Sequence, residues 1–257
     1  NLDMTKMNKN SLFTALYLLC LYLACQFVPY YKMSDNYVFQ TLIKTMFVLV
    51  VMTLAILEIF KNKECYYRKG KMKYYLLVLP FLLSCFSNII YGTLFSLPRH
   101  AILDVGLFFM NVVLLIVSVI VEEIIFRYFL LFFFSFLFEK NNLKTFLSVL
   151  CSSLCFSLMH VINFTSGNYS GTAMQIVYTF FLGMILGYIA ISTDNIILPI
   201  VGHTCFNLFN MLLFENLYTL SDFSISYISV SAAFVVFSVA YLVFFIYMNK
   251  RRETHAS

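Results

Sequence analysis

Six polar residues lie deep inside hydrophobic stretches of the sequence, where each side chain needs a partner or a role. They are Glu122, Glu123, Arg127, His160, His203 and Asn207. A charged side chain at the centre of a bilayer costs about 2.5–3.5 kcal/mol on insertion scales. We therefore take these six residues as the candidates for function.

Helical spacing predicts which of these side chains can meet. Residues four apart share one face of a helix, so Glu123 can pair with Arg127, and His203 shares a face with Asn207. Glu122 points about 100° away from Glu123 and has no partner on its own helix. Such a carboxylate must be protonated, meet a charge from another helix, or face water.

Three kinds of function are compatible with this set of residues. The first is a structural polar network that holds helices together, and the second is a proton or ion relay in a transporter. The third is hydrolysis, in which Glu122 and one imidazole share a water molecule and remove its proton. The second imidazole and an amide would then donate hydrogen bonds to a carbonyl oxygen as it gains charge.

A zinc site is the alternative to metal-free chemistry. One carboxylate and two imidazoles can bind zinc and leave a position open for water. The sequence has no His-Glu-x-x-His motif, however, and it spreads the candidates over three hydrophobic stretches. We therefore expect no metal and no other cofactor.

The composition defines the setting of these residues. Of the 257 residues, 61% are hydrophobic and only 11% are charged, and the mean hydropathy is +0.87. Soluble domains carry about 25% charged residues. These values exclude a soluble enzyme, a disordered chain and a nucleic-acid-binding module, and they predict an integral membrane protein in contact with the lipid bilayer.

Hydrophobic stretches predict an all-α, polytopic bundle of about eight transmembrane helices. The stretches are 11–28, 37–60, 74–96, 102–138, 143–163, 172–192, 195–214 and 225–248. Each can cross a hydrocarbon core of about 30 Å as a helix. We expect one membrane domain over 1–257, with the candidate residues in a core at about 102–214. The fourth stretch is long enough that it must tilt, protrude or break.

The distribution of Lys and Arg predicts that both termini are cytoplasmic. With eight spans, 13 of the 17 basic residues fall on the cytoplasmic side and only Lys32 and Arg99 fall in outer loops. The 13 are Lys6, Lys9, Lys61, Lys63, Arg68, Lys69, Lys71, Lys73, Lys140, Lys144, Lys250, Arg251 and Arg252. Such a bias is typical of cytoplasmic segments.

Three short motifs on successive hydrophobic stretches resemble those of a known family. They read Glu122-Glu123-Ile-Ile-Phe-Arg127, Phe156-Ser-Leu-Met-His160 and His203-Thr-Cys-Phe-Asn207. This order resembles the CAAX protease and bacteriocin-processing family, also called the Abi or CPBP family. The resemblance covers roughly 105–210.

The resemblance implies an intramembrane endopeptidase of about eight helices. By this likeness, Glu122 and His160 would activate water without a metal, and His203 and Asn207 would form the oxyanion site. Glu123 and Arg127 would orient the first carboxylate and brace the cavity.

The substrate that the resemblance implies is a peptide. We expect cleavage of a small peptide or leader precursor, in peptide-signal or bacteriocin maturation, by a multi-pass protein of a bacterial cytoplasmic membrane. The alternative is a non-catalytic membrane protein that acts in bacteriocin immunity or as a scaffold for a sensor or transporter.

Idealised spans place two of the candidate residues at different depths. His160 would lie near the outer end of its helix, and His203 near the inner end of its own. A shared cavity therefore requires a sunken loop, a shortened helix or a different topology of the later helices.

Overall fold

The computed structural model describes residues 10–28, 36–61, 105–141, 143–166 and 169–214, and the single positions 236, 239, 242 and 243. The elements in the described ranges are all helical. They are α1 (Asn10–Phe27), α2 (Tyr37–Lys61), α5 (Val105–Glu123), the π-helix η3 (Ile124–Leu130), α6 (Leu131–Leu137), α7 (Lys144–Met159), the 3₁₀-helix η4 (His160–Ser166), α8 (Tyr169–Thr193) and α9 (Ile197–Phe214).

Four segments of the described chain are long and apolar enough to cross a membrane. They are Tyr37–Phe60, Val105–Leu137, Lys144–Thr165 and Gly171–Thr193. Two shorter apolar helices accompany them, at Leu12–Phe27 and Ile197–Leu208. The prediction of an all-helical membrane protein is thus confirmed within the described part of the chain. The stretch 74–96, and all but four positions of 225–248, lie outside the described residues, so the count of eight spans and the orientation of the termini stay predictions.

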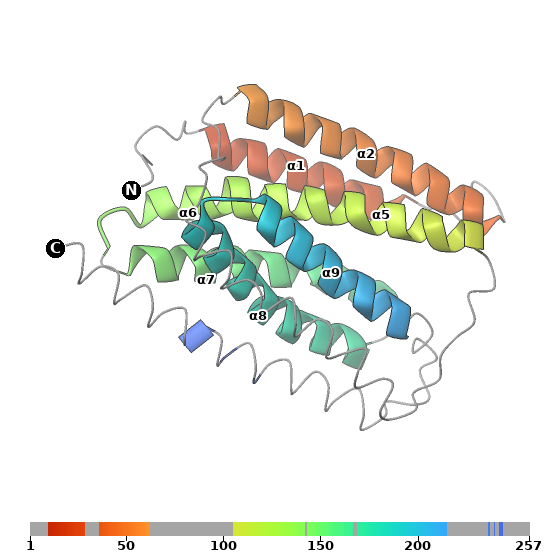
Figure 1. Cartoon of the computed structure of the whole chain (residues 1–257). Coiled ribbons are helices and arrows are strands. Elements are labelled where there is room, and N and C mark those ends of the chain that lie inside the picture. The colour runs from red at the N-terminus through yellow and green to blue at the C-terminus, as the bar shows by residue number, and fades with distance from the viewer. Residues whose placement is uncertain are drawn as a thin grey trace.

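The long fourth stretch forms the central rod of the described bundle. Its segment Val105–Leu137 runs through α5, η3 and α6 as one continuous helical segment, with the π-helix in its middle. Helices α1 and α2 lie on one side of this rod, and α7, α8 and α9 lie on the other (Figure 1). All residues of the rod from 121 to 132 are buried. The middle of the rod therefore faces protein on all sides.

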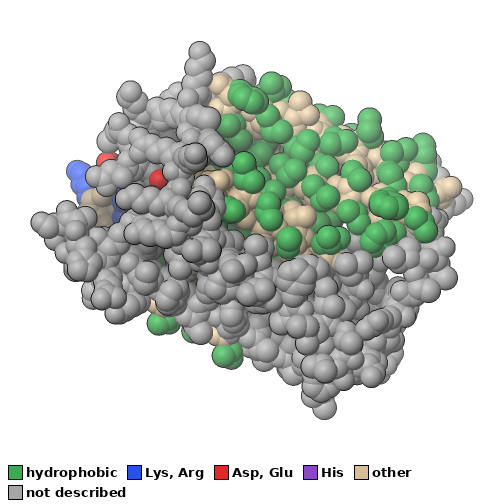
Figure 2. Space-filling view, viewed as in Figure 1, with side chains coloured by type: hydrophobic (Ala, Val, Ile, Leu, Met, Phe, Trp, Pro, Cys, Tyr) green, Lys and Arg blue, Asp and Glu red, His purple; other side chains and the backbone are tan. Residues whose placement is uncertain are grey.

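The outer surface of the α1–α2 side is hydrophobic. Phe13, Phe39, Met46, Val50 and Phe60 are all exposed on these two helices. Figure 2 shows hydrophobic side chains over the described part of this face, over α2 and its neighbours. A continuous apolar surface of this kind fits contact with lipid rather than water.

Side chains from the loops define where two helices begin. Asn36 accepts a hydrogen bond from the backbone of Val38 (2.9 Å) and caps α2. Asn195 does the same for Ile197 (2.7 Å) at the start of α9. Asp194, between α8 and α9, has a φ of 50°, a left-handed conformation that Asp tolerates after a helix. The chain therefore reverses direction in a very short turn.

Small residues bring α7 and α8 close together. A Cβ atom added at Gly183 would lie 3.0 Å from Cβ of Ser153, and one at Gly187 would lie 2.9 Å from Cγ1 of Val149. Helices in membranes commonly approach through small residues four apart. The hydroxyl of Ser157 also donates to the carbonyl of Ile176 on α8, at 2.8 Å. These contacts define the position of α7, which leads directly into His160.

Candidate active site

The first motif lies where the central rod changes its helical form. Glu122 and Glu123 are the last two residues of α5, and Arg127 lies within η3. Single turns of π-helix inside α-helices are frequent at functional sites. All three side chains are buried in the interior of the bundle, so their charges need partners from the protein.

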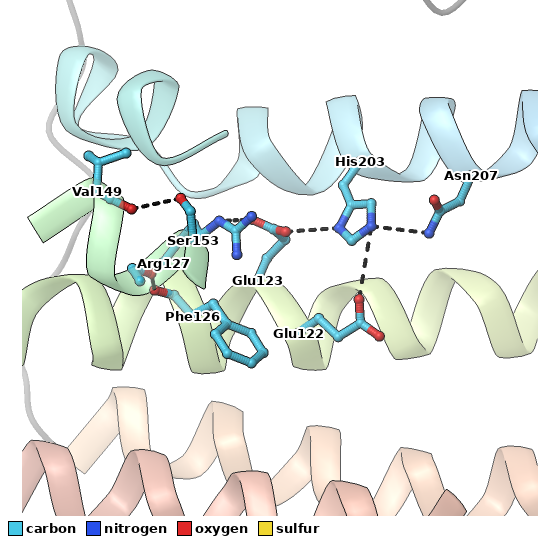
Figure 3. A network of polar contacts seen from close by, with 9 residues as sticks. Glu122, Glu123, Phe126, Arg127, Val149, Ser153, His203 and Asn207 are labelled. Atoms are coloured by element: carbon cyan, nitrogen blue, oxygen red, sulfur yellow. Dashed lines mark hydrogen bonds and ion pairs between the residues drawn. The ribbon is translucent and has the colours of Figure 1, made fainter. Parts of the chain in front are cut away.

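Glu123 is the centre of the polar network. Its Oε2 lies 3.2 Å from Nε of Arg127, which confirms the ion pair that the spacing predicted. Its Oε1 accepts a hydrogen bond of 2.8 Å from Nδ1 of His203 on α9. Figure 3 shows Arg127, Glu123 and His203 in a row between the rod and α9. Glu123 therefore holds the imidazole of His203 in a defined orientation.

The spacing leaves Glu122 without a partner on its own helix, and in the structure its partners come from other helices. The hydroxyl of Tyr22 on α1 donates to Oε1 of Glu122 at 2.6 Å. The other oxygen, Oε2, lies 3.9 Å from Nε2 of His203, beyond hydrogen-bond distance. Sequence reasoning missed Tyr22, because the chain has 18 tyrosines and none of the motifs points to α1.

The third motif forms a pair on one face of α9. The amide Nδ2 of Asn207 lies 3.1 Å from Nε2 of His203. Because Nδ1 of His203 faces Glu123, the Nε2 side of the ring is directed toward Asn207 and Glu122 (Figure 3). This confirms that His203 and Asn207 share a face.

His160 joins the cluster through an aromatic ring. The ring of Phe156 lies edge-on to the imidazole of His160, at 5.3 Å between centroids, and to that of His203, at 5.5 Å. The guanidinium of Arg127 also lies over the Phe156 ring, 4.4 Å from its centre. Nε2 of His160 is buried and has no hydrogen-bond partner within the described part of the chain.

A late start of α9 reconciles the depths of the two histidines. Phe156 lies 12 residues into α7, or about 18 Å, whereas His203 lies six residues into α9, or about 9 Å. Since these two side chains touch, α9 must begin well inside the bundle. The turn before it is buried accordingly, with Thr193 and Asn195 both sheltered from solvent. Of the predicted alternatives, the structure supports a sunken loop, at the turn before α9.

The six candidate residues therefore meet in the interior of the bundle. Five of them form one polar network, and His160 lies beside it, across Phe156. A carboxylate, two imidazoles and an amide at one place can polarise a water molecule and a carbonyl group. Within the described ranges, no group of three or more His, Cys, Asp or Glu residues is placed to hold a metal ion. Metal independence of the chemistry stays a prediction.

Comparison with known proteins agrees with this geometry. Residues 104–209 match a family model described as type II CAAX prenyl endopeptidase Rce1-like, a segment of 106 of the 257 residues that includes all three motifs. No curated protein and no solved structure matched the chain. The model describes a family of prenyl endopeptidases, and the match covers less than half of the chain. The resemblance to the CAAX protease family that the three motifs indicated is therefore confirmed over the segment that contains them.

Proposed function

We propose that the protein is a glutamate-dependent intramembrane endopeptidase that cleaves a small peptide or leader precursor. The observation that carries this proposal is that the first and third motifs form one buried polar network with the second motif packed beside it, within the segment that matches an endopeptidase family. The substrate class follows the resemblance of the motifs to bacteriocin-processing proteins, and the enzyme would act in a bacterial cytoplasmic membrane.

In the proposed reaction, Glu122 and His160 activate water. Glu122 keeps Oε2 without a hydrogen bond from the described residues, and His160 keeps a buried nitrogen without a partner. A water molecule between these groups would lose its proton as its oxygen attacks the scissile carbonyl carbon. The same proton would then pass to the departing amine, so that a peptide bond is exchanged for a carboxyl and an amino group.

His203 and Asn207 would stabilise the oxyanion that forms. Nε2 of His203 and Nδ2 of Asn207 lie 3.1 Å apart and face the same space. An oxyanion that accepts hydrogen bonds from both nitrogens would replace the hydrogen bond between His203 and Asn207. For this role Nε2 must carry a proton, and because Nδ1 donates to Glu123, the acting form is an imidazolium held by that carboxylate. Glu123 and Arg127 would thus orient the site through His203.

The proposal is tested by comparing membrane-associated peptides, by mass spectrometry, from cells with the intact protein and from cells with Glu122→Ala. A peptide pair that accumulates only with the intact protein identifies the substrate and the scissile bond. The purified protein should then cleave this peptide. Glu122→Ala and His160→Ala should abolish cleavage, and Asn207→Ala should lower the rate by about 10²–10³-fold, the scale for an oxyanion donor.

The matched control is Glu139→Ala, which removes an exposed carboxylate from the turn after α6. It should leave cleavage unchanged. Full activity in Glu122→Ala would refute the proposal and would favour the non-catalytic role in immunity or scaffolding. Exhaustive chelation tests whether the reaction needs a metal. If chelation abolished activity and added zinc restored it, the site would depend on zinc.

A further inference from the structure

The hydroxyl group of Tyr22 contacts the carboxylate that the proposed reaction uses. It donates to Oε1 of Glu122 at 2.6 Å, a short distance typical of a hydrogen bond to an ionised acceptor. Tyr22 is only 4% exposed and Glu122 only 8%. Within the described residues, no other group donates a hydrogen bond to this carboxylate. Tyr22 therefore determines which of the two oxygens of Glu122 accepts a hydrogen bond.

The helix that carries Tyr22 is suited to hold it in place. Ala15, Leu18, Tyr22 and Cys25 are all buried, and their spacing puts them on one stripe of α1. This stripe packs on the central rod at η3 and contributes to the core cluster there. The ring is thus held by packing, and the hydroxyl proton is directed at Glu122.

We propose that Tyr22 is a positioning residue of the active site, supplied by a helix outside the segment that matches the endopeptidase family. It binds Oε1 of Glu122 and leaves Oε2 facing the space beside His203 and Asn207, where the water and the peptide would meet. This role rests on the proposed function. It also assigns the N-terminal helix α1 a direct part in the site.

The physical reason is the freedom of a glutamate side chain. Glu122 can rotate about three bonds, and a carboxylate without a donor would turn between several orientations. A hydrogen bond to a charged group contributes about 1.5–3 kcal/mol. In a water-poor interior, the loss of such a bond is more costly than at the surface. Tyr22 thereby limits Glu122 to the orientation in which one oxygen is free to take a proton.

The first test measures the contact without any reference to catalysis. Thermal unfolding of the full-length protein in detergent is compared for the intact protein, Tyr22→Phe, Glu122→Met and the double variant. Tyr22→Phe keeps the ring and removes only the oxygen, so it should lower the Tm of the intact protein and have little effect in the Glu122→Met background. If Tyr22→Phe lowered the Tm equally in the intact protein and in Glu122→Met, the contact between Tyr22 and Glu122 would be disproved.

The second test measures positioning. The probe is a quenched fluorogenic peptide that spans the scissile bond found in the mass-spectrometric comparison. Tyr22→Phe should lower kcat by roughly 10- to 100-fold, the range that corresponds to one hydrogen bond to a charged group, and leave KM unchanged. Rates are expressed per folded protein, so that a loss of stability alone does not count.

Two controls separate positioning from packing. Tyr17→Phe removes a hydroxyl from the same helix, where the residue is 48% exposed, and should change neither Tm nor kcat. Val48→Ala makes a cavity in α2 and should lower Tm with kcat per folded protein unchanged. An unchanged kcat in Tyr22→Phe would overturn the positioning role while the proposed protease stands. A protein that cleaves no peptide would overturn both, even if the Tyr22–Glu122 coupling in Tm is found.

Discussion

At the scale of residues, two neighbouring glutamates have different environments because of helical geometry alone. Glu123 lies on the same side of the helix as Arg127 and faces His203 on α9. Glu122 points about 100° away and meets Tyr22 on α1. Glu123 contacts a partner through each of its two oxygens. Glu122 has one oxygen, Oε2, that accepts no hydrogen bond from the described residues. In the proposed reaction, this difference is the reason that Glu122, rather than Glu123, acts on water.

The ion pair of Arg127 with Glu123 yields a prediction about stability. Breaking a buried pair leaves one charge without compensation, at a cost of about 3–5 kcal/mol. Arg127→Met should therefore lower the free energy of unfolding by about that amount, measured by denaturant titration in detergent micelles. Lys140→Met, in the exposed turn after α6, should change it by less than about 0.5 kcal/mol. Similar losses in the two variants would contradict a specific ion pair.

At the scale of elements, the π-helix η3 and the helix α7 are tied together beside the site. The carbonyl of Phe126 accepts the backbone N–H of Leu131, and it also accepts the hydroxyl of Ser152 on α7, at 2.7 Å. The Phe126 and Phe156 rings pack edge to face, 5.2 Å apart. The irregular segment that carries Arg127 is therefore held against the helix that leads into His160.

The close approach of α7 and α8 should be sensitive to one added side chain. In Gly183→Val, the new Cβ would lie 3.0 Å from Cβ and 3.2 Å from Cα of Ser153, so backbone as well as side chain must move. Overpacking of this kind costs about 1–3 kcal/mol. We expect a lower Tm in detergent and a loss of peptide cleavage, because α7 carries Phe156 and leads directly into His160.

The control for this variant is Gly106→Val on α5, where the residue is exposed. It introduces the same β-branched side chain at an exposed position of a helix. Its Tm should stay close to that of the intact protein. If Gly183→Val were as stable and active as Gly106→Val, the tight α7–α8 contact would be disproved.

At the scale of the whole molecule, the site lies where two groups of helices meet on the central rod. One group supplies Tyr22, the rod supplies Glu122 and its neighbours, and the other group supplies both histidines. Figure 1 shows this division, with α1 and α2 on one side and α7, α8 and α9 on the other. The candidate residues and Tyr22 thus come from helices far apart in the sequence, and both groups of helices contribute to the candidate site.

The orientation of the bundle can be tested with cysteine labelling. In a background without the seven native cysteines, Glu139→Cys lies in the turn after α6, beside two lysines expected on the cytoplasmic side. Thr165→Cys lies at the opposite end of α7–η4. A membrane-impermeant maleimide should label Thr165→Cys in intact cells, and Glu139→Cys only after permeabilisation. The reverse pattern would show that the orientation predicted from Lys and Arg is wrong.

Much of the local arrangement could be predicted from the sequence. The pairing of Glu123 with Arg127 and the shared face of His203 and Asn207 follow from i, i+4 spacing, and both are found. The helical class follows from hydrophobic length, because a bilayer accepts only backbones whose polar groups are satisfied internally. The contact of Tyr22 with Glu122 could not be predicted, since it depends on the rotation and depth of α1 against the rod.

What the sequence by itself determined is therefore the class of protein and the local sets of polar residues. These are hydrophobic helices that contain two acidic residues, one arginine, two histidines and one asparagine. Only the tertiary structure decided which of these sets meet. It did so by starting α9 deep in the bundle after the buried Thr193–Asn195 turn, and by packing α1 so that Tyr22 faces Glu122. The physical reason is that helical periodicity defines directions within one helix, whereas depth and rotation between helices depend on side-chain packing across the whole bundle.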